Sequence, residues 1–195
     1  MNLDLVEEKK SVYPESGWHL CCQDNKTSNM FLRVKPGFDS RVRLLFSPYK
    51  LVKIFTNDRR CLNLNSEDIG RQLQQKYGDK LNDISERICS WCIDRTDDTL
   101  KILDLPMSVS RTIGNRESLA GKKISGIEQG CDWRIITNGK TGMDVRYEAI
   151  YIEETPLTEA QKDMIKNSGI EQDLSKIFKP LNFEDAEKKI LGLDG

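Results

Sequence analysis

With 195 residues, of which 37% are hydrophobic, the chain is long enough to build one domain around a buried core. Its net charge of −1 gives no overall attraction to nucleic acid, and no apolar run approaches the about 20 residues of a membrane-spanning helix. The mixed, acidic start MNLDLVEEKK does not read as a secretory signal. We therefore expect a soluble intracellular protein without membrane contact, whose six cysteines are reduced thiols.

Residues 1–29 are polar and show no clear periodicity, so we expect them to form an arm ahead of the main domain, residues 30–154. The domain opens with three short alternating or apolar stretches, which turns containing Pro or Gly separate. We predict strands at Phe31–Val34, Arg41–Leu45 and Leu51–Phe55.

The charge of this opening block is unusual. Residues 31–60 hold eight Lys and Arg side chains against two acids, although the whole chain is nearly neutral. Because side chains alternate along a strand, Arg41 and Arg43 are predicted on a solvent-facing side, with Val42 and Leu44 on the core side. The block therefore combines an apolar inner face with a cationic outer face, and local fields of this kind matter more than the total charge.

The remaining elements follow from capping residues, alternation and turn types. In chain order, we expect a helix at 66–77 capped by Ser66, a hairpin of Arg87–Arg95 and Thr99–Leu105, a helix at 107–119, a loop at Gly121–Gly130, a hairpin of Asp132–Thr137 and Val145–Ile152, and short helical pieces at 171–179 and 182–191. Residues 155–195 are predicted to form an acidic C-terminal tail of short helices, the first capped by Thr158. Residues 153–195 carry a net charge of −4.

This order of elements predicts a fold that is mainly β with helices. Seven or so short strands separated by turns favour an OB-type small β-barrel with inserted helices and a helical C-terminal tail. The helix at 107–119 would cross the end of that barrel. The alternative is an open α+β sheet.

The basic block and the aromatic residues near it have the composition of a groove for single-stranded nucleic acid, in which cations follow the phosphates and aromatic faces stack on bases. The other interpretation is a solvated sheet face, because charged residues are mostly exposed. On the first interpretation, the candidate DNA-binding residues are Arg33, Lys35, Arg41, Arg43, Tyr49, Lys50, Lys53, Phe55, Arg59, Arg60, Trp91, Lys101, Arg134 and Tyr147.

The strand pattern separates the aromatic candidates. Phe55 is the strongest candidate for stacking on a base, because it lies on the outer strand face while Val52 and Ile54 point to the core. Trp133 shares a face with Ile135 and is expected in the core. The two rings whose place the pattern leaves open are Trp91 and Tyr147.

Metal binding and catalysis find less support. Cys89 and Cys92 form a CxxC pair, but they fall within a predicted strand, so their side chains point to opposite faces, and no second CxxC exists. We favour buried free thiols and expect no metal and no other cofactor. With one histidine, no Gly-rich phosphate loop and no HExxH or GxSxG motif, we also expect no enzymatic activity.

Taken together, several segments resemble the phage-type single-stranded DNA-binding proteins with an OB fold, the superfamily of the T-even phage helix-destabilising protein. The matching places are Gly37 with Arg41–Leu45, the "IDR" hairpin at Ile93–Leu105, the hairpin at Asp132–Tyr147, the helix start Leu157-Thr158-Glu159 and the segment Leu174–Pro180. The family's zinc insertion is not carried over, because the interval 57–87 holds only Cys61. The chain's last residues are also only mildly acidic compared with the tails of that class.

The resemblance implies a non-catalytic protein that coats single-stranded DNA in replication, recombination or repair, in the host cytoplasm if a phage encodes it. Its partners would be single-stranded DNA and, through the C-terminal tail, replication or recombination proteins. The alternatives are a protein–protein interaction module of a replisome or an assembly, and an RNA-binding protein on the same fold.

Overall fold

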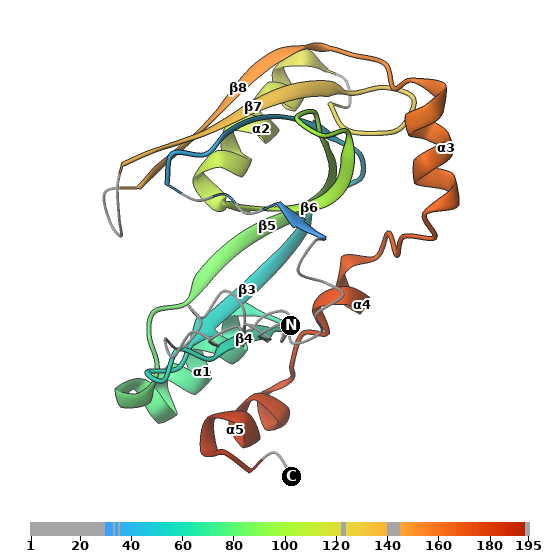
Figure 1. The fold of residues 1–195 in the computed structure, drawn as a ribbon. Coiled ribbons are helices and arrows are strands. Elements are labelled where there is room, and N and C mark those ends of the chain that lie inside the picture. The colour runs from blue at the N-terminus through green and yellow to red at the C-terminus, as the bar shows by residue number, and fades with distance from the viewer. Residues whose placement is uncertain (1–29, 33, 35, 122–123, 140–144, 194–195) are drawn as a thin grey trace, which may run out of the picture.

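A computed structural model describes residues 30–32, 34, 36–121, 124–139 and 145–193. Figure 1 shows its strands and helices in chain order. The strands are β1 (Phe31–Leu32), β2 (Asp39–Leu44), β3 (Tyr49–Phe55), β4 (Cys61–Leu64), β5 (Ser85–Asp94), β6 (Thr99–Pro106), β7 (Cys131–Asn138) and β8 (Arg146–Glu154). The helices are α1 (Glu67–Tyr77), the 3-10 turn η1 (Gly78–Lys80), α2 (Met107–Ala120), α3 (Glu159–Asn167), α4 (Leu174–Phe178) and α5 (Phe183–Leu191).

In the described residues, the eight strands form one sheet in the order β1-β6-β5-β2-β7-β8, and β3 joins it between β4 and β5. β5 is ten residues long, and along one of its edges it pairs first with β3 and then with β2. Val42 to Leu44 of β2 lie opposite the last residues of β5, and Tyr49 to Lys53 of β3 lie opposite its first residues. The break predicted at Ser47-Pro48 is the point where the chain passes from one half of the sheet to the other.

The fold is therefore mixed α/β, with one strand-rich sheet and several helices, and the predicted closed barrel is wrong. The path of paired strands ends at β1 and β8, and no ladder joins these ends within the described ranges. The outer edge of β6 is occupied by β1, which runs parallel to it at Ile102 and Leu103. The described strands therefore form a curled sheet whose last strand, β8, is not paired with β6.

Most predicted elements are confirmed. The side chain of Ser66 caps α1 by accepting from the backbone N–H of Ile69, and Thr158 with Gln161 forms a reciprocal capping box at the start of α3. The helix α2 forms over the predicted range although it contains Gly114. The strand β4 is an element that the pattern missed, because it is only four residues long and follows a charged turn.

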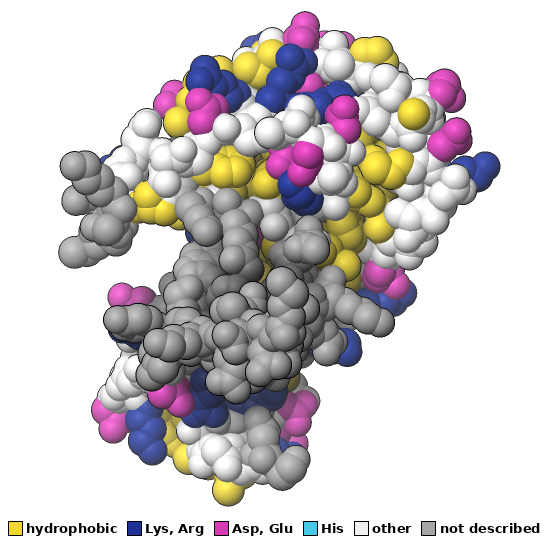
Figure 2. Space-filling view, viewed as in Figure 1, with side chains coloured by type: hydrophobic (Ala, Val, Ile, Leu, Met, Phe, Trp, Pro, Cys, Tyr) yellow, Lys and Arg dark blue, Asp and Glu magenta, His cyan; other side chains and the backbone are white. Residues whose placement is uncertain are grey.

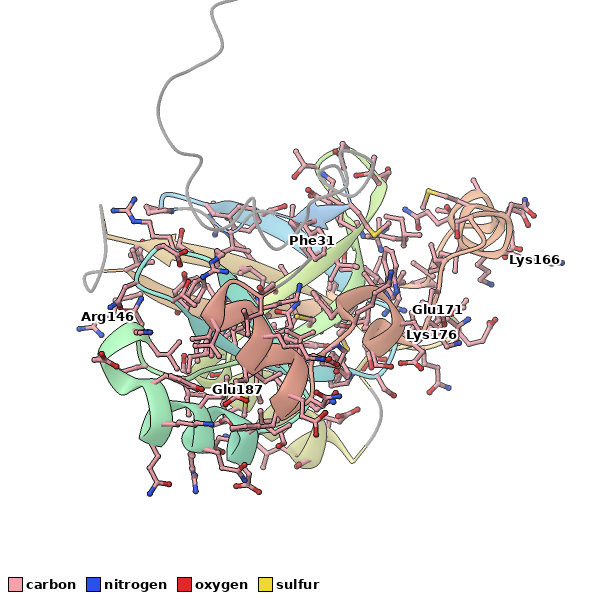
Figure 3. All side chains as sticks on the ribbon, turned by 90° about the horizontal axis from the view of Figure 1, so that it is seen from below. Phe31, Arg146, Lys166, Glu171, Lys176 and Glu187 are labelled. Atoms are coloured by element: carbon pink, nitrogen blue, oxygen red, sulfur yellow. The ribbon has the colours of Figure 1, made fainter. Side chains whose placement is uncertain are left out.

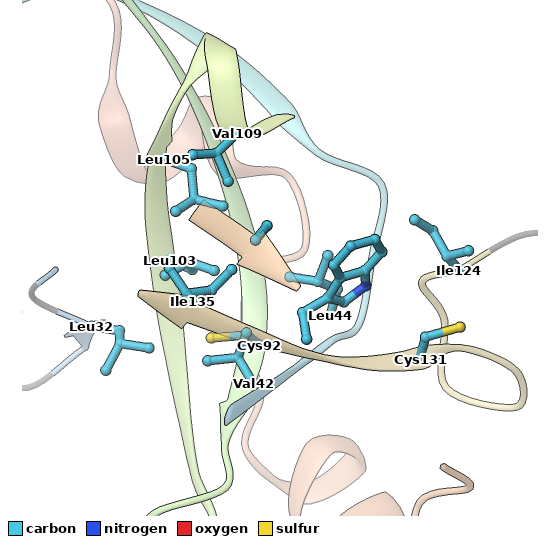
Figure 4. Close-up of a cluster of buried hydrophobic side chains, with 12 residues drawn as sticks. Leu32, Val42, Leu44, Cys92, Leu103, Leu105, Val109, Ile124, Cys131 and Ile135 are labelled. Carbon is cyan, nitrogen blue, oxygen red and sulfur yellow. The ribbon is translucent and has the colours of Figure 1, made fainter. Parts of the chain in front are cut away.

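Three buried clusters hold these elements together. The first lies inside the curl of β2, β5, β6, β7 and β8 with α2, and it includes Val42, Leu44 and Trp133, as predicted (Figure 4). The second lies between the sheet and α3 and α4, and the third joins β3 and β4 to α1 and α5 and contains Val52 and Ile54. Burial of apolar surface in each cluster stabilises the fold by about 25 cal/mol per Å² removed from water.

The tail is part of these clusters rather than a separate extension. Leu157 and Phe178 belong to the second cluster, and Ala186 and Ile190 belong to the third. Residues from 155 onward therefore run along the sheet from the β7–β8 half to the β3–β4 half, as Figure 1 shows. Their burial explains why one face of the strands that we expected to be open to solvent is partly covered.

Candidate nucleic-acid interface

Arg41 and Arg43 converge on the buried carboxylate of Asp132. The Arg41 Nε donates to Asp132 Oδ2 at 2.6 Å, and its Nη2 donates to Glu153 at 2.7 Å. Arg43 is fully buried, with Nε 4.0 Å from Asp132 Oδ1 and donating to the carbonyl oxygen of Thr155. The predicted exposure of Arg43 is therefore wrong, because the start of the C-terminal segment covers this face of β2.

A third arginine completes this Asp132 network. Arg95 donates from Nε to Asp132 Oδ2 at 3.1 Å and from Nη2 to Oδ1 at 3.2 Å. Arg41, Arg95 and Asp132 are residues of three separate segments that carry the family resemblance, and here they tie β2, β5 and β7 together. Part of that sequence pattern therefore serves the fold.

A second network surrounds the buried carboxylate of Asp104. Lys53 Nζ lies 2.6 Å from Asp104 Oδ2, and Arg87 Nε donates to Oδ1 at 2.7 Å. Burial by itself would raise the pKa of Asp104, but the two cations hold this pKa below its usual range. The predicted solvent exposure of Lys53 is wrong, because β6 brings an acid to it and the side chain is buried.

Two aromatic candidates lie under the C-terminal helices. Trp91 is 2% exposed, and its indole N–H donates to the carbonyl oxygen of Glu171 at 2.9 Å. Tyr49 is half-buried and stacks on Phe178 of α4, with ring centroids 6.0 Å apart. Trp91 therefore has no free face for a base, which corrects that assignment, and one face of Tyr49 is already occupied.

The remaining predicted cations of the described residues lie near the surface, most of them beside acids. The pairs are Lys50 with Glu86, Arg60 with Asp58, Lys101 with Asp94 and Asp97, and Arg134 with Asp39. Figure 2 shows the same intermixing, with Lys and Arg side chains among Asp and Glu over the described part of one face. Exposed pairs such as Arg134 with Asp39 are weak, so phosphate oxygens can compete for these cations, whereas the Lys101–Asp94 pair is largely buried.

Arg59 and Arg146 are exposed and have no acidic partner among the described residues. Arg59 lies in the turn between β3 and β4 with a positive φ of 67°. Arg146 begins β8 and lies at the edge of the molecule in Figure 3, on the side opposite Lys166. The predicted candidates Arg33 and Lys35 fall outside the described residues.

The structure brings five residues into one strip, which we call the Tyr147–Phe55 strip: Tyr147 of β8, Arg87 of β5, Asp104 of β6, and Lys53 and Phe55 of β3. The Arg87 guanidinium carbon lies 5.9 Å from the centroid of the Tyr147 ring. Asp104 then links Arg87 to Lys53, and Phe55 follows Lys53 on the same strand face. The strip places two half-buried aromatic rings at the ends of a buried ion-pair network.

Several residues that shape this surface were not among the candidates. Arg87 was missed because its contact with Tyr147 joins residues far apart in sequence. Arg146 and Tyr151 were missed as well. The alternation of Tyr147, Ala149 and Tyr151 along β8 is the signal that points to Tyr151.

The cysteines follow their predicted geometry. Cys89 lies in the cluster beneath α3 and α4, whereas Cys92 lies in the cluster inside the curl, so the two thiols point to opposite faces of β5. Burial raises the pKa of the Cys92 thiol well above its usual range. Within the described ranges, no group of three or more His, Cys, Asp or Glu side chains is placed to hold a metal ion.

In the part of the chain that the structure describes, no helix combines the length and the apolar character that crossing a membrane requires. The chain matches no family model, and no curated protein matches it in sequence.

Proposed function

We propose that this protein binds single-stranded DNA without strong sequence preference, through a partly open barrel of the OB type. The order β6-β5-β2-β7-β8, with α2 between β6 and β7, supports this proposal. β2 and β3 together take the place of one long first strand, because both pair with β5. An OB fold is a five-stranded, partly open barrel, and its second and third strands with two loops bind oligonucleotides.

By this correspondence, the second and third strands are β5 and β6, and the connection after the first strand is residues 56–84. The Tyr147–Phe55 strip runs across β5 and β6 from the start of β8 to the end of β3, where that connection begins. This position is the single observation that carries the proposal. Among the residues that the structure describes, we find no comparable arrangement for a catalytic role, and fold likeness alone would not establish a function.

The proposed mechanism uses two kinds of contact. Bases stack on Phe55 and Tyr147, each stack contributing about 1–3 kcal/mol whatever the base. Phosphates are held by Arg59 and Arg146 and by cations such as Arg134 that exchange an exposed acid for a phosphate. A protein of this kind coats and protects single strands during replication, recombination or repair, and the likeness to the phage-type family supports that role.

The test is a titration of the full-length chain into labelled oligo-dT, duplex DNA and RNA of equal length, followed by fluorescence anisotropy. We expect tight binding to the DNA single strand alone, with log K falling by about 0.7 per phosphate contact for each unit of log salt. Phe55→Leu should weaken that binding about 5- to 100-fold. The matched control is Phe183→Leu, which changes a half-buried ring at the start of α5, away from the strip.

Three results would redirect the proposal. Equal or tighter binding to RNA would assign the same surface to RNA. Failure to bind any nucleic acid would overturn the proposal in favour of a protein–protein interaction module. Binding to single-stranded DNA that Phe55→Leu and Phe183→Leu leave equally strong would place the contact surface elsewhere.

A further inference from the structure

A second surface lies beside the strip, between α2 and the β7–β8 hairpin. It is a hollow of about 430 Å³, a volume within the range of small-molecule sites. We call it the α2 hollow, and the residues that matter here are Asn115, Arg116 and Leu119 of α2, Trp133 of β7 and Tyr151 of β8. β8 forms one end of the sheet, so this side of the hollow is not covered by a further described strand.

Trp133, one of the residues that line the hollow, carries a buried group without a partner among the described residues. The residue is 1% exposed, and its indole N–H has no hydrogen-bond acceptor in the part of the chain that is described. Trp91, by contrast, donates its indole N–H to Glu171. A buried donor without an acceptor is costly, so a ligand that brings a carbonyl or ring nitrogen to Trp133 gains a hydrogen bond that the protein itself does not make.

Arg116 and Tyr151 provide a flat, cationic platform. The Arg116 guanidinium carbon lies 4.5 Å from the centroid of the Tyr151 ring, which is the geometry of a cation–π pair. Arg116 is exposed and has no acidic partner among the described residues. A guanidinium stacked on a ring offers its donors to a phosphate while its plane faces a base.

Leu119 adds an apolar rim, because its side chain is 83% exposed and a planar ligand in the hollow would cover it. Asn115 brings both donor and acceptor groups. An aromatic heterocycle that carries hydrogen-bond acceptors and a nearby negative charge matches all of these groups. A nucleobase with its phosphate has this chemistry.

We propose that the α2 hollow binds a nucleobase and its phosphate, as an extra base subsite for the strand held on the Tyr147–Phe55 strip; this inference rests on the proposed function. Tyr147 and Tyr151 share one face of β8, and four residues of strand span about 13 Å. A strand bound at Tyr147 therefore reaches the hollow along β8. The Tyr151 ring packs edge-on against Trp133, with the two ring centroids 5.8 Å apart.

The first test follows the indole N–H groups by NMR in the full-length chain labelled with ¹⁵N-tryptophan. Oligo-dT, and separately the free nucleotide dTMP, should shift the indole signal of Trp133 but not that of Trp91. Trp133→Phe assigns the signal, because it removes the N–H and keeps a ring in the core. Binding of oligo-dT without a shift of the Trp133 signal would overturn the inference.

The second test uses variants with a matched charge control. Tyr151→Leu and Arg116→Gln should each weaken oligo-dT binding, about 5- to 100-fold for the loss of the ring. Arg111→Gln removes an exposed cation from the same helix outside the hollow and should weaken binding less than Arg116→Gln. Equal effects of the two arginine variants would overturn the inference, and thermal unfolding of each variant checks that it is folded.

These outcomes separate the two proposals. A chain that binds oligo-dT but is indifferent to Tyr151→Leu and Arg116→Gln keeps the proposed function and loses the base subsite. A chain that binds no oligonucleotide overturns the proposed function. If dTMP then still shifts the Trp133 signal, the hollow is a site for the same base and phosphate in a free nucleotide.

Discussion

The Asp132 and Asp104 networks are alike in composition and different in surroundings. Each places one buried carboxylate among more cations than it can neutralise. Around Asp132, the arginines also donate hydrogen bonds to Glu153 and to backbone carbonyl oxygens such as that of Thr155. Around Asp104, Arg87 lies beside the ring of Tyr147, and Phe55 follows Lys53 on the same strand face. The neighbouring segments, rather than the cation itself, decide whether a charged strand residue meets backbone carbonyls or an aromatic ring.

The largest effect is expected from Asp132→Asn, which leaves three arginines without their shared charge. Removing one partner of a buried ion pair costs about 3–5 kcal/mol, because the other charges remain buried. Urea unfolding at neutral pH measures the change. The matched control is Asp39→Asn, whose carboxylate forms an exposed pair with Arg134 and should barely move the midpoint. Similar midpoints for the two variants would show that the network does not stabilise the fold.

Asp104→Asn should cost about 3 kcal/mol at neutral pH for the same reason. It should also change the acid response. Because the folded-state pKa of Asp104 is lowered, its contribution is present above about pH 4 and is lost as the pH falls through the folded-state value. The difference in urea midpoint between the variant and the unchanged protein should therefore be smaller at pH 3 than at pH 7. A constant gap between them would contradict the assigned role of Asp104.

A smaller effect, on binding rather than folding, is expected from Tyr147→Leu. Loss of one stacking face should weaken oligo-dT binding about 5- to 100-fold, with a salt slope close to that of the unchanged protein. Anisotropy titrations at two salt concentrations measure both quantities. Tyr77→Leu serves as the control, since Tyr77 is a half-buried tyrosine of α1 that bonds to Glu187. Equal affinities of the two variants would remove Tyr147 from the interface.

The smallest effect is expected from Arg134→Gln. Its partner Asp39 is exposed, so the unfolding midpoint should stay where it is. If Arg134 exchanges Asp39 for a phosphate, the slope of log K against log salt becomes shallower by about 0.7. A slope that does not change would show that Arg134 keeps its acidic partner when DNA is bound.

The sequence pattern predicted those features that depend only on residues close together in the chain. Alternation identified Val42, Leu44, Val52 and Ile54 as core residues, and capping chemistry located the start of α1 at Ser66. It assumed, however, that the second face of each strand meets solvent. The segment that begins at Thr155 packs on that face, and so the rule failed for Arg43, which donates to the carbonyl oxygen of Thr155. The same segment buries Trp91, whose place the pattern had left open although it was a candidate for binding DNA.

The ion pairs that neutralise the basic block could not be predicted from the sequence for a related reason. Arg43 lies near Asp132, and Lys53 meets Asp104, so each cation and its acid are separated by 50 residues or more. Only the sheet order brings them together. The barrel was predicted from the number of strands, whereas the pairing order, in which β8 and β6 are not joined among the described residues, depends on contacts between residues far apart in sequence.

The path of the C-terminal segment has a consequence for how the protein is made. Ala186 and Ile190 complete the cluster beneath β3 and β4, which were synthesised more than a hundred residues earlier. During translation, α1 can pack on β3 and β4 first, but the part of this cluster that α5 supplies is missing until residues 186–190 have left the ribosome. Until then, apolar side chains of β4 such as Leu62 and Leu64 are only partly covered, and partly covered strands are sites for aggregation and for chaperones.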